Sequence, residues 1–300
     1  MRKLLYLLSV LTVVLWNCSP HSDSDFPSAL VHFKPYKGNP VFSGTGRNTW
    51  DKQIRERGFI LFDEGIYKMW YTGYNEDSIK TRYLGYATSP DGLKWSRYPG
   101  NPIYTKHWTE DVQVIKYNNR YYMFAEGLHD IAFLMESEDG ILWTKTGDLD
   151  IRQTNGEPIS PGAYGTPSVW IEDGIWYLFY ERHDEAIWLA TSTNLKTWTN
   201  VQDEPVIKRG PESYDKHAVA VDQIIKYQDK FYAYYHATAF DPWRDWTTCV
   251  AVSGDLIHWK KYEKNPIISG NRSSGIIVQH DTVFRLYTMH PQIEVFFSSE

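Results

Sequence analysis

The sequence predicts an all-β protein, a five-bladed β-propeller whose ring is closed by an N-terminal strand. Three observations support this prediction: a hairpin pattern occurs five times, a turn pattern ending in Trp alternates with it, and helical periodicity is absent over any useful length. A four-stranded sheet that is repeated radially forms a propeller blade, and five blades of about 55 residues account for almost all of the chain.

The hairpin repeat begins at residues 63–71, where Asp-Glu-Gly precedes the alternating aromatic residues of Ile-Tyr-Lys-Met-Trp-Tyr. A turn signal followed by period-two alternation is typical of a β-hairpin. Two stacked β-sandwiches with a chance repeat are the structural alternative. The steps between equivalent aromatic positions are 54, 55, 55 and 53 residues, and these positions are Tyr67, Tyr121, Trp176, Phe231 and Phe284.

The turn repeat is Thr-Ser-Pro-Asp-Gly-Leu-Lys-Trp at residues 88–95, and it follows a short apolar strand. It recurs at 136–143, 192–198 and 252–259. The fifth unit lacks this turn, and Val31–Tyr36 lies before the first complete blade. We therefore expect Val31–Tyr36 to pair into blade five, which removes the open edges of the ring.

The first eighteen residues have the pattern of an export signal. A short positive segment precedes the apolar run Leu4–Trp16, which is too short for a comfortable membrane span. Leu-Trp-Asn-Cys-Ser at 15–19 resembles a bacterial lipoprotein box, which implies lipidation of Cys18. A plain signal peptide with an incidental cysteine is the alternative. The expected organisation is a signal at 1–18, a polar tether at 19–30 and the propeller at 31–300, exported and anchored at the cell surface or in the periplasm through the lipid alone.

Composition excludes several classes of function. The net charge is −6 without a basic cluster, so nucleic acid is not an expected partner. Two cysteines exclude a disulfide framework and a Cys-rich zinc site, and no His-Glu-x-x-His motif is present. We expect no metal in the chemistry and no required cofactor, with a structural calcium as the one allowance. We also expect a monomer.

The repeated motifs resemble those of the five-bladed glycosidase superfamily. They are Gly-Ile-Tyr-Lys-Met-Trp-Tyr-Thr-Gly at 65–73, Gly-Tyr-Ala-Thr-Ser-Pro-Asp-Gly at 85–92 and Gly-Asn-Pro-Ile at 100–103. The superfamily includes family 43 arabinanases and xylosidases, family 32 invertases, family 117 anhydrogalactosidases and family 130 mannoside phosphorylases. The resemblance implies a carbohydrate ligand and cleavage of a glycosidic bond. Sialidases have a similar turn, but there Gly does not follow Asp directly as it does at 91–92 and 139–140.

Catalytic side chains are expected at the funnel mouth, just before each inner strand or just after the second strand. In blades two and three these positions hold Glu110, Asp111, Glu126 and Glu181. Glycoside hydrolysis needs one protonated and one ionised carboxyl group, and crowded carboxylates raise the pKa of at least one of them. We assign Glu181 as general acid, because apolar aromatic residues precede it, and Asp111 as base. Glu126 or Glu110 would tune the pair.

Further residues near these positions are candidates for binding the substrate. Family 43 enzymes have an aspartate base near the start of the first inner strand, where this chain has Arg57. The chain departs from that family here, and Asp51 and Glu56 are the candidates to replace the base. Each candidate also has a structural alternative. The arginines could form an ion pair at the rim, and the aromatic residues could pack in the core. Asp51 could have a structural role at the blade edge, because a similar segment recurs around Asp215. The candidates are Asp51, Arg55, Glu56, Arg57, Trp108, Tyr164, His217 and His236.

The function that these observations favour is an exo-acting glycoside hydrolase. Its substrate would be a plant or algal oligosaccharide, with a furanoside such as arabinofuranose as one candidate. A glycoside phosphorylase is the alternative enzyme and would need a cationic phosphate site, for which Arg55 and Arg57 are the obvious pair. A glycan-binding surface lipoprotein without catalytic activity is the alternative from another class.

Overall fold

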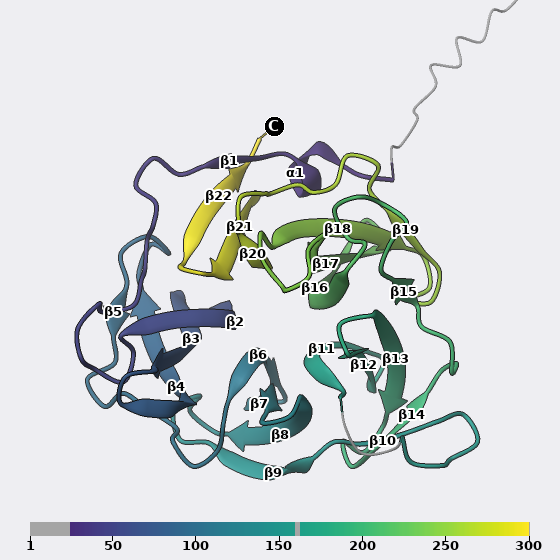
Figure 1. The fold of residues 1–300 in the computed structure, drawn as a ribbon, viewed down its shortest axis with the longest axis horizontal. Helices are drawn as coiled ribbons and strands as arrows, with labels where there is room; N and C mark the ends of the chain where they lie inside the picture. Colours follow the sequence, from purple (N-terminus) through teal and green to yellow (C-terminus); the bar gives the residue numbers. More distant parts are fainter. Residues whose placement is uncertain (1–24, 160–162, 300) are drawn as a thin grey trace, which may run out of the picture.

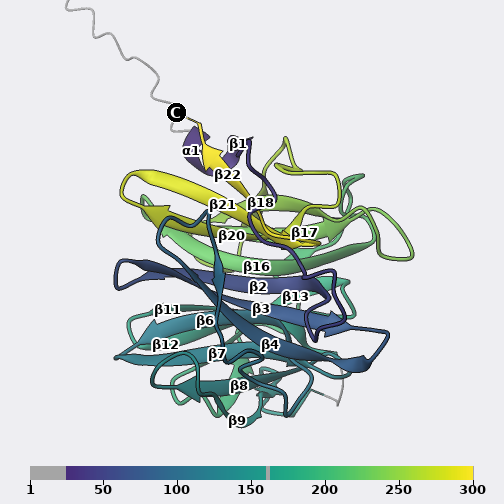
Figure 2. The same ribbon diagram turned by 90° about the vertical axis from the view of Figure 1, so that its left-hand side faces the viewer.

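A computed structural model describes residues 25–159 and 163–299, and it shows five β-sheets arranged around a central axis (Figure 1). One strand of each sheet lies nearest the axis, and the strands that pair after it lie progressively outward (Figures 1 and 2). The prediction of a five-bladed β-propeller is confirmed. Within the described ranges, no helix has the length and hydropathy needed to cross a membrane.

The blades are mostly four-stranded antiparallel sheets. Blade one contains β2 (Gln53–Asp63), β3 (Ile66–Asn75), β4 (Ile79–Ser89) and β5 (Ser96–Arg97). Blade two contains β6 (Glu110–Tyr117), β7 (Arg120–Gly127), β8 (Ile131–Ser137) and β9 (Thr144–Asp148). Blade four contains β16 (Ala218–Tyr227), β17 (Lys230–Thr238), β18 (Thr247–Ser253) and β19 (Trp259–Lys261).

Blade three has two additional short strands at its periphery. Its main strands are β11 (Gly165–Glu172), β12 (Ile175–Arg182), β13 (Ala186–Ser192) and β14 (Thr197–Asn200). β10 (Asp150–Arg152) is parallel to β14, and β15 (Ile207–Lys208) pairs with β13. The free Cys249 lies in β18 and is fully buried, as expected for a strand thiol.

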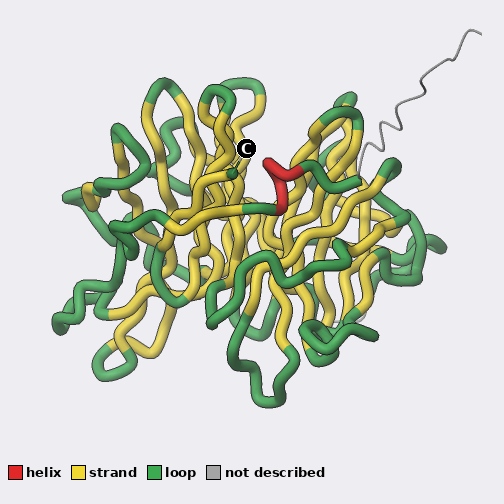
Figure 3. The backbone as a smooth tube through the Cα atoms, turned by 90° about the horizontal axis from the view of Figure 1, so that it is seen from above, coloured by secondary structure: helices red, strands yellow, loops and turns green. Residues whose placement is uncertain are grey.

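Blade five closes the ring with strands from both ends of the chain. It contains β20 (Ser273–His280), β21 (Val283–His290), β22 (Glu294–Ser298) and, outermost, β1 (Phe33–Pro35). Because β1 is antiparallel to β22, the expected closure by the N-terminal segment is confirmed. The helix α1 (Ser28–Val31) packs beside β22 (Figure 3).

The expected tether at 19–30 needs a correction. Leu30 is fully buried in the core of blades four and five, and Asp25 forms ion pairs with Lys230 and Lys260 at 2.9 Å each. The folded body therefore includes residues 25–30, because α1 offers apolar side chains that cover the outer face of these blades. Cys18, the signal and the rest of the tether lie outside the described residues.

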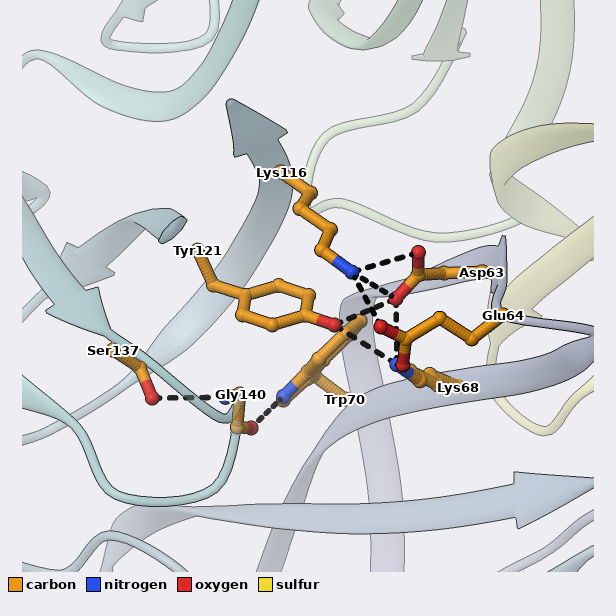
Figure 4. A network of polar contacts seen from close by, with 8 residues as sticks. All are labelled: Asp63, Glu64, Lys68, Trp70, Lys116, Tyr121, Ser137 and Gly140. Carbon is orange, nitrogen blue, oxygen red and sulfur yellow. Dashed lines mark hydrogen bonds and ion pairs between the residues drawn. The ribbon is translucent and has the colours of Figure 1, made fainter. Parts of the chain in front are cut away.

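The turn repeat stabilises contacts between neighbouring blades. In blade two the Ser137 hydroxyl accepts the Gly140 N–H at 2.9 Å, and Asp139 Oδ1 accepts the two following N–H groups. This arrangement exposes the Gly140 carbonyl to the Trp70 indole N–H of blade one, at 2.7 Å (Figure 4). The repeat therefore has a structural role, because it satisfies turn N–H groups and joins blades.

The inner strands begin irregularly, where the backbone departs from regular pairing. Register shifts interrupt the pairing at the starts of β2, β6, β11 and β16. Glu56, Asp111 and Thr166 adopt left-handed φ values of 60°, 45° and 43°. Such strained residues cost on the order of 1–3 kcal/mol each and cluster at functional sites. The strain therefore marks this end of the axis as the place to look for chemistry.

Candidate active site

A cavity of about 660 Å³ lies at the strained end of the propeller axis. Its wall is formed by the beginnings of β2, β6 and β11 and by the ends of β7, β12, β17 and β21. These are the positions at which the sequence predicted functional side chains. The structure brings eight of the predicted residues to this cavity: Arg55, Glu56, Trp108, Glu110, Asp111, Glu126, Glu181 and His236.

Glu126 and Glu181 approach each other across the backbone of Gly165. A Cβ atom built on Gly165 would lie 2.3 Å from Glu126 Oε2 and 2.4 Å from Glu181 Oε1. The two carboxyl oxygens are therefore less than about 5 Å apart. Only glycine leaves room for both groups at this point of blade three, so the residue at the start of β11 sets their separation.

Backbone N–H groups orient both carboxyl groups. Glu126 Oε2 accepts the Thr166 N–H at 2.6 Å. Glu181 Oε1 accepts the Gly165 N–H at 3.1 Å, and Glu181 Oε2 accepts the Asp184 N–H at 2.6 Å. Both side chains are more than nine-tenths buried, and neither forms an ion pair with a described residue. The fold therefore holds two carboxyl groups without a compensating cation.

Burial and the neighbouring carboxylates raise the pKa values of these acids. Burial, followed by the charge of Asp184, raises the pKa of Glu181 to about 8. Burial, Asp111 and Glu110 raise the pKa of Glu126 well above its ordinary value. Removing a carboxylate from water disfavours its charged form, and a second carboxylate nearby adds to this effect. Glu181 therefore carries a proton at neutral pH, and the same effects favour the protonated form of Glu126.

Glu110 and Asp111 are the first two residues of β6, the strand that pairs with the strand β7 that holds Glu126. Asp111 is half-buried, and its Oδ1 accepts the Arg57 backbone N–H at 2.7 Å, which fixes the orientation of the carboxyl group. Glu110 pairs in register with Glu126 and accepts a hydrogen bond from the Trp108 indole. Burial and then Asp111 raise the pKa of Glu110 to about 7.

His236 lies across the cavity from these acids, in blade four. One of its ring nitrogens is 2.6 Å from Asp222 Oδ1, and the other Asp222 oxygen accepts the Gly275 N–H at 2.9 Å. Burial disfavours a charged imidazole, but the fully buried Asp222 outweighs this effect and raises the pKa of His236. Burial, with Arg55 and His236 nearby, lowers the pKa of His290 to about 4.

The cavity rim adds aromatic and cationic side chains from the segment that joins β17 to β18. Trp243 is 59% exposed although it lines the cavity, and the ring of Trp246 lies 5.0 Å from that of His236. Arg244 lies over the Phe240 ring at 4.8 Å and forms no ion pair with any described residue. An exposed tryptophan and a free guanidinium at a cavity rim are typical of ligand contacts.

Four predicted substrate-binding residues do not line this cavity. Arg57 is fully buried at the axis, where its guanidinium donates to the carbonyl oxygens of Val221 at 2.7 Å, Pro167 at 2.6 Å and Asp111. It therefore joins blade one to blades two, three and four, and its charge is compensated by backbone dipoles instead of a ligand. Tyr164 packs in the core between blades two and three.

Asp51 and His217 lie outside the cavity for different reasons. Asp51 is buried at the edge of blade one and accepts hydrogen bonds from Arg97 at 2.8 Å and Thr49 at 2.9 Å. The equivalent residue Asp215 pairs with Lys261 at 2.5 Å. The ion pair of Asp51 and Arg97 therefore recurs in blade four, with both residues shifted by 164 positions. The blade-edge role left open for Asp51 is the correct one. His217 contacts Trp243 from behind the rim, with ring centroids 6.4 Å apart.

Two acidic residues at the site, Asp130 and Asp222, were missed from the sequence, whereas Asp184 ends the dense polar run 180–184 that follows a predicted buried strand and already pointed to the site. Asp130 and Asp184 line the cavity from the turns after β7 and β12, and Asp222 orients His236. The signal for Asp130 was present, because His-Asp occurs at both 129–130 and 183–184, with left-handed φ values at all four residues. Asp222 was also visible as a single charge that follows the apolar run 218–221.

No group of three or more potential metal ligands is present among the described residues. At the axis, where carbonyl oxygens from three blades converge, the guanidinium of Arg57 supplies the positive charge. The site is thus built from carboxyl groups, one histidine–aspartate pair and a cationic rim.

Comparison with known proteins places this fold among carbohydrate-cleaving propellers. No protein-family profile matches the sequence. A glycosyl hydrolase from Bacteroides ovatus superposes with a TM-score of 0.69 at 14% identity, over 91% of this chain and 95% of that chain. The α-L-arabinofuranosidase PaAbf62A from Podospora anserina gives a TM-score of 0.66 at 12% identity, over 92% and 99%. The fold is that of five-bladed glycoside hydrolases and phosphorylases.

One similarity also extends to the sequence. The 1,2-β-oligomannan phosphorylase of Thermoanaerobacter sp. (strain X514) is 23% identical over 226 residues, which cover 69% of this chain and 72% of the relative. These similarities establish the shared fold.

Proposed function

We propose that this protein cleaves glycosidic bonds in oligosaccharides, with Glu181 as general acid and Asp111 as base. The observation that carries the proposal is the placement of Glu181 and Glu126 across Gly165, in the same cavity as Asp111. Cleavage of a glycosidic bond needs one protonated and one ionised carboxyl group. Burial without a cation supplies the protonated member at neutral pH.

The geometry supports a division of work between the two residues. Glu181, with a pKa of about 8, donates its proton to the oxygen of the departing sugar as the bond from that oxygen to the anomeric carbon breaks. Asp111 takes a proton from water, whose oxygen forms the new bond to the anomeric carbon. Burial and the neighbouring carboxylates raise the pKa of Glu126, which lessens the negative charge beside Glu181.

An exo-acting hydrolase on plant or algal oligosaccharides is the form of this activity that we favour. Arg57 fills the propeller axis beside the cavity, so the site is a blind pocket, which suits the end of a sugar chain. The fold shared with the arabinofuranosidase of Podospora anserina supports a furanoside such as arabinofuranose among the candidates.

A glycoside phosphorylase is the second candidate, and Arg244 is the observation in its favour. The pair considered from the sequence is not available, because Arg57 is buried and Arg55 is paired with Glu56. Arg244 is unpaired among the described residues and shares the cavity with His236, so the two form an alternative phosphate site. Similarity to an oligomannan phosphorylase also supports this candidate.

The experiment is a screen of the purified protein on arabino-, xylo-, agaro- and β-1,2-manno-oligosaccharides, with and without inorganic phosphate. Hydrolysis releases the free sugar under both conditions, which is the expected result. Release of a sugar 1-phosphate that requires phosphate and is lost in Arg244→Ala would replace hydrolysis by phosphorolysis. Binding of a glycan without any cleavage would favour the non-catalytic alternative instead.

The export signal and lipid anchor remain a separate proposal. Cys18 lies in the sequence context of a lipoprotein box. Replacing Cys18 by Ala is expected to move the protein from the membrane fraction to the soluble fraction of the cell. Membrane association that does not change in the variant would contradict lipidation at this cysteine.

A further inference from the structure

A second hollow of about 450 Å³ adjoins the cavity on the outer side of blade two. It is bounded by the segment that joins blades one and two, by the turn after β7 and by the outer strands β8 and β9 (Figure 1). Trp108 lines both the hollow and the cavity, so the two spaces adjoin at its side chain.

Trp108 is a fixed element between the two spaces. Its indole N–H donates to Glu110, and the Arg82 guanidinium lies over its ring at 4.7 Å. Arg82 is itself held near Glu110, with Nε 3.6 Å from Oε2. A tryptophan held by a hydrogen bond and a stacked guanidinium offers a flat surface with little loss of conformational entropy on binding.

The floor of the hollow is apolar and its rim is polar. Leu128 is 55% exposed there, and Lys145 lies over the Phe133 ring at 4.5 Å while it pairs with Asp148 at 2.7 Å. Lys106 adds a rim cation that pairs with no described carboxylate. Sugar rings present C–H faces to apolar surfaces and hydroxyl groups to polar side chains, so this combination suits a carbohydrate.

We propose that the hollow, defined by Trp108, Leu128, Phe133 and Lys106, binds the sugar residues that follow the cleaved bond. This inference rests on the proposed function and adds a substrate class to it: chains of three or more sugar residues instead of disaccharides. The occupant is the continuation of the chain in the cavity, because Trp108 forms part of both walls.

Leu128→Asp tests the proposal, with Leu142→Asp as the matched control. Both leucines are exposed turn residues of blade two, at 55% and 75%, so neither substitution removes core packing. For the oligosaccharide series that the screen identifies, from disaccharide to pentasaccharide, wild type is expected to favour longer chains in kcat/KM. Leu128→Asp should reduce this preference about five- to ten-fold, because it replaces an apolar contact by a charge. Leu142→Asp should retain it.

Binding to a glycan array, with the Glu181→Gln variant as the non-cleaving probe, separates this proposal from the proposed function. If wild type cleaves no glycan, but longer chains bind better on the array and Leu128→Asp removes the difference, the hollow is a subsite and the catalytic proposal fails. If glycans are cleaved but chain length has no effect, or Leu128→Asp behaves like Leu142→Asp, the subsite is wrong and the catalytic proposal stands.

Discussion

The two ends of strands β2 and β6 hold acidic residues in opposite electrostatic settings. At the end far from the cavity, Asp63 accepts hydrogen bonds from Lys68 at 2.5 Å, Tyr121 at 2.6 Å and Lys116 at 3.0 Å (Figure 4). At the cavity end, Glu110 has one cation at 3.6 Å, and the neighbouring Glu126 has none among the described residues.

The presence or absence of nearby cations moves the pKa values of the acids at the two ends in opposite directions. Burial alone would raise the pKa of Asp63, but the bonds from Lys68, Tyr121 and Lys116 outweigh it and lower the pKa to about 2. At the cavity, burial acts together with carboxylate neighbours and raises the pKa of Glu181 to about 8. The same repeat thus supplies an ionised structural acid where cations accompany it, and acids with raised pKa values, which are the candidates for chemistry, where they do not.

The largest expected effect is the loss of cleavage in Glu181→Gln. Removing a general acid costs on the order of 10²–10⁴ in rate, and the amide retains the shape of the side chain so that sugar binding persists. Steady-state kinetics on the identified oligosaccharide measure this. Glu136→Gln is the control, because Glu136 pairs with Arg120 at the end of blade two that is far from the cavity. Retention of more than about a third of the wild-type turnover would make Glu181 a rim residue.

The dependence of stability on pH is the next effect. The folded-state pKa of Glu181, about 8, lies above its ordinary value of 4.5, so the folded protein holds more protons between these values. Its contribution to the free energy of unfolding is fully present below about pH 4.5 and is lost as pH rises through 8. Urea titrations from pH 5 to 8 are expected to show a decline on the order of a few kcal/mol.

Glu181→Gln is expected to reduce this decline, because the amide does not titrate, while the part due to Glu110 and Glu126 remains. Glu136→Gln should retain the wild-type profile. Equal pH profiles for wild type and Glu181→Gln would show that the carboxyl group is already ionised in the folded protein.

The ionic cluster of Asp63, Lys68 and Lys116, at the end far from the cavity, is expected to affect stability and not activity. Asp63→Asn should lower the free energy of unfolding by about 1.5–3 kcal/mol, because two lysines lose the charge that compensates them, while kcat stays near wild type. Denaturant titrations and activity assays check the two parts. Asp77→Asn is the control, because Asp77 is a 71% exposed partner of Lys52. A strong loss of activity in Asp63→Asn would break the distinction between the two ends.

The smallest effect is expected for Lys116→Met. Lys68 remains bonded to Asp63, and Lys116 is 25% exposed, so the loss should be below about 1 kcal/mol. Thermal unfolding beside the exposed Lys94→Met variant measures it. A loss as large as that of Asp63→Asn would mean that the two lysines act as one unit.

The fold and the composition of the cavity followed from periodicity, but the roles of single residues did not. The repeats predicted which positions meet at the funnel, and Glu110, Glu126 and Glu181 are there because strand pairing is local and periodic. Arg57 was misassigned because its partners are carbonyl oxygens, which every residue has and no sequence pattern marks. Asp130 was overlooked because its approach depends on the shape of a turn.

Arg57 also links the architecture of the ring to the reaction. Its backbone N–H holds the Asp111 carboxylate, and its guanidinium holds carbonyl oxygens of blades two, three and four. A ring with a sixth blade would have a wider axis than one arginine can span, so a change in blade number would also displace the Asp111 carboxyl group. Duplication or loss of a blade, a common route by which repeat proteins evolve, is thereby closed to this chain unless position 57 changes as well.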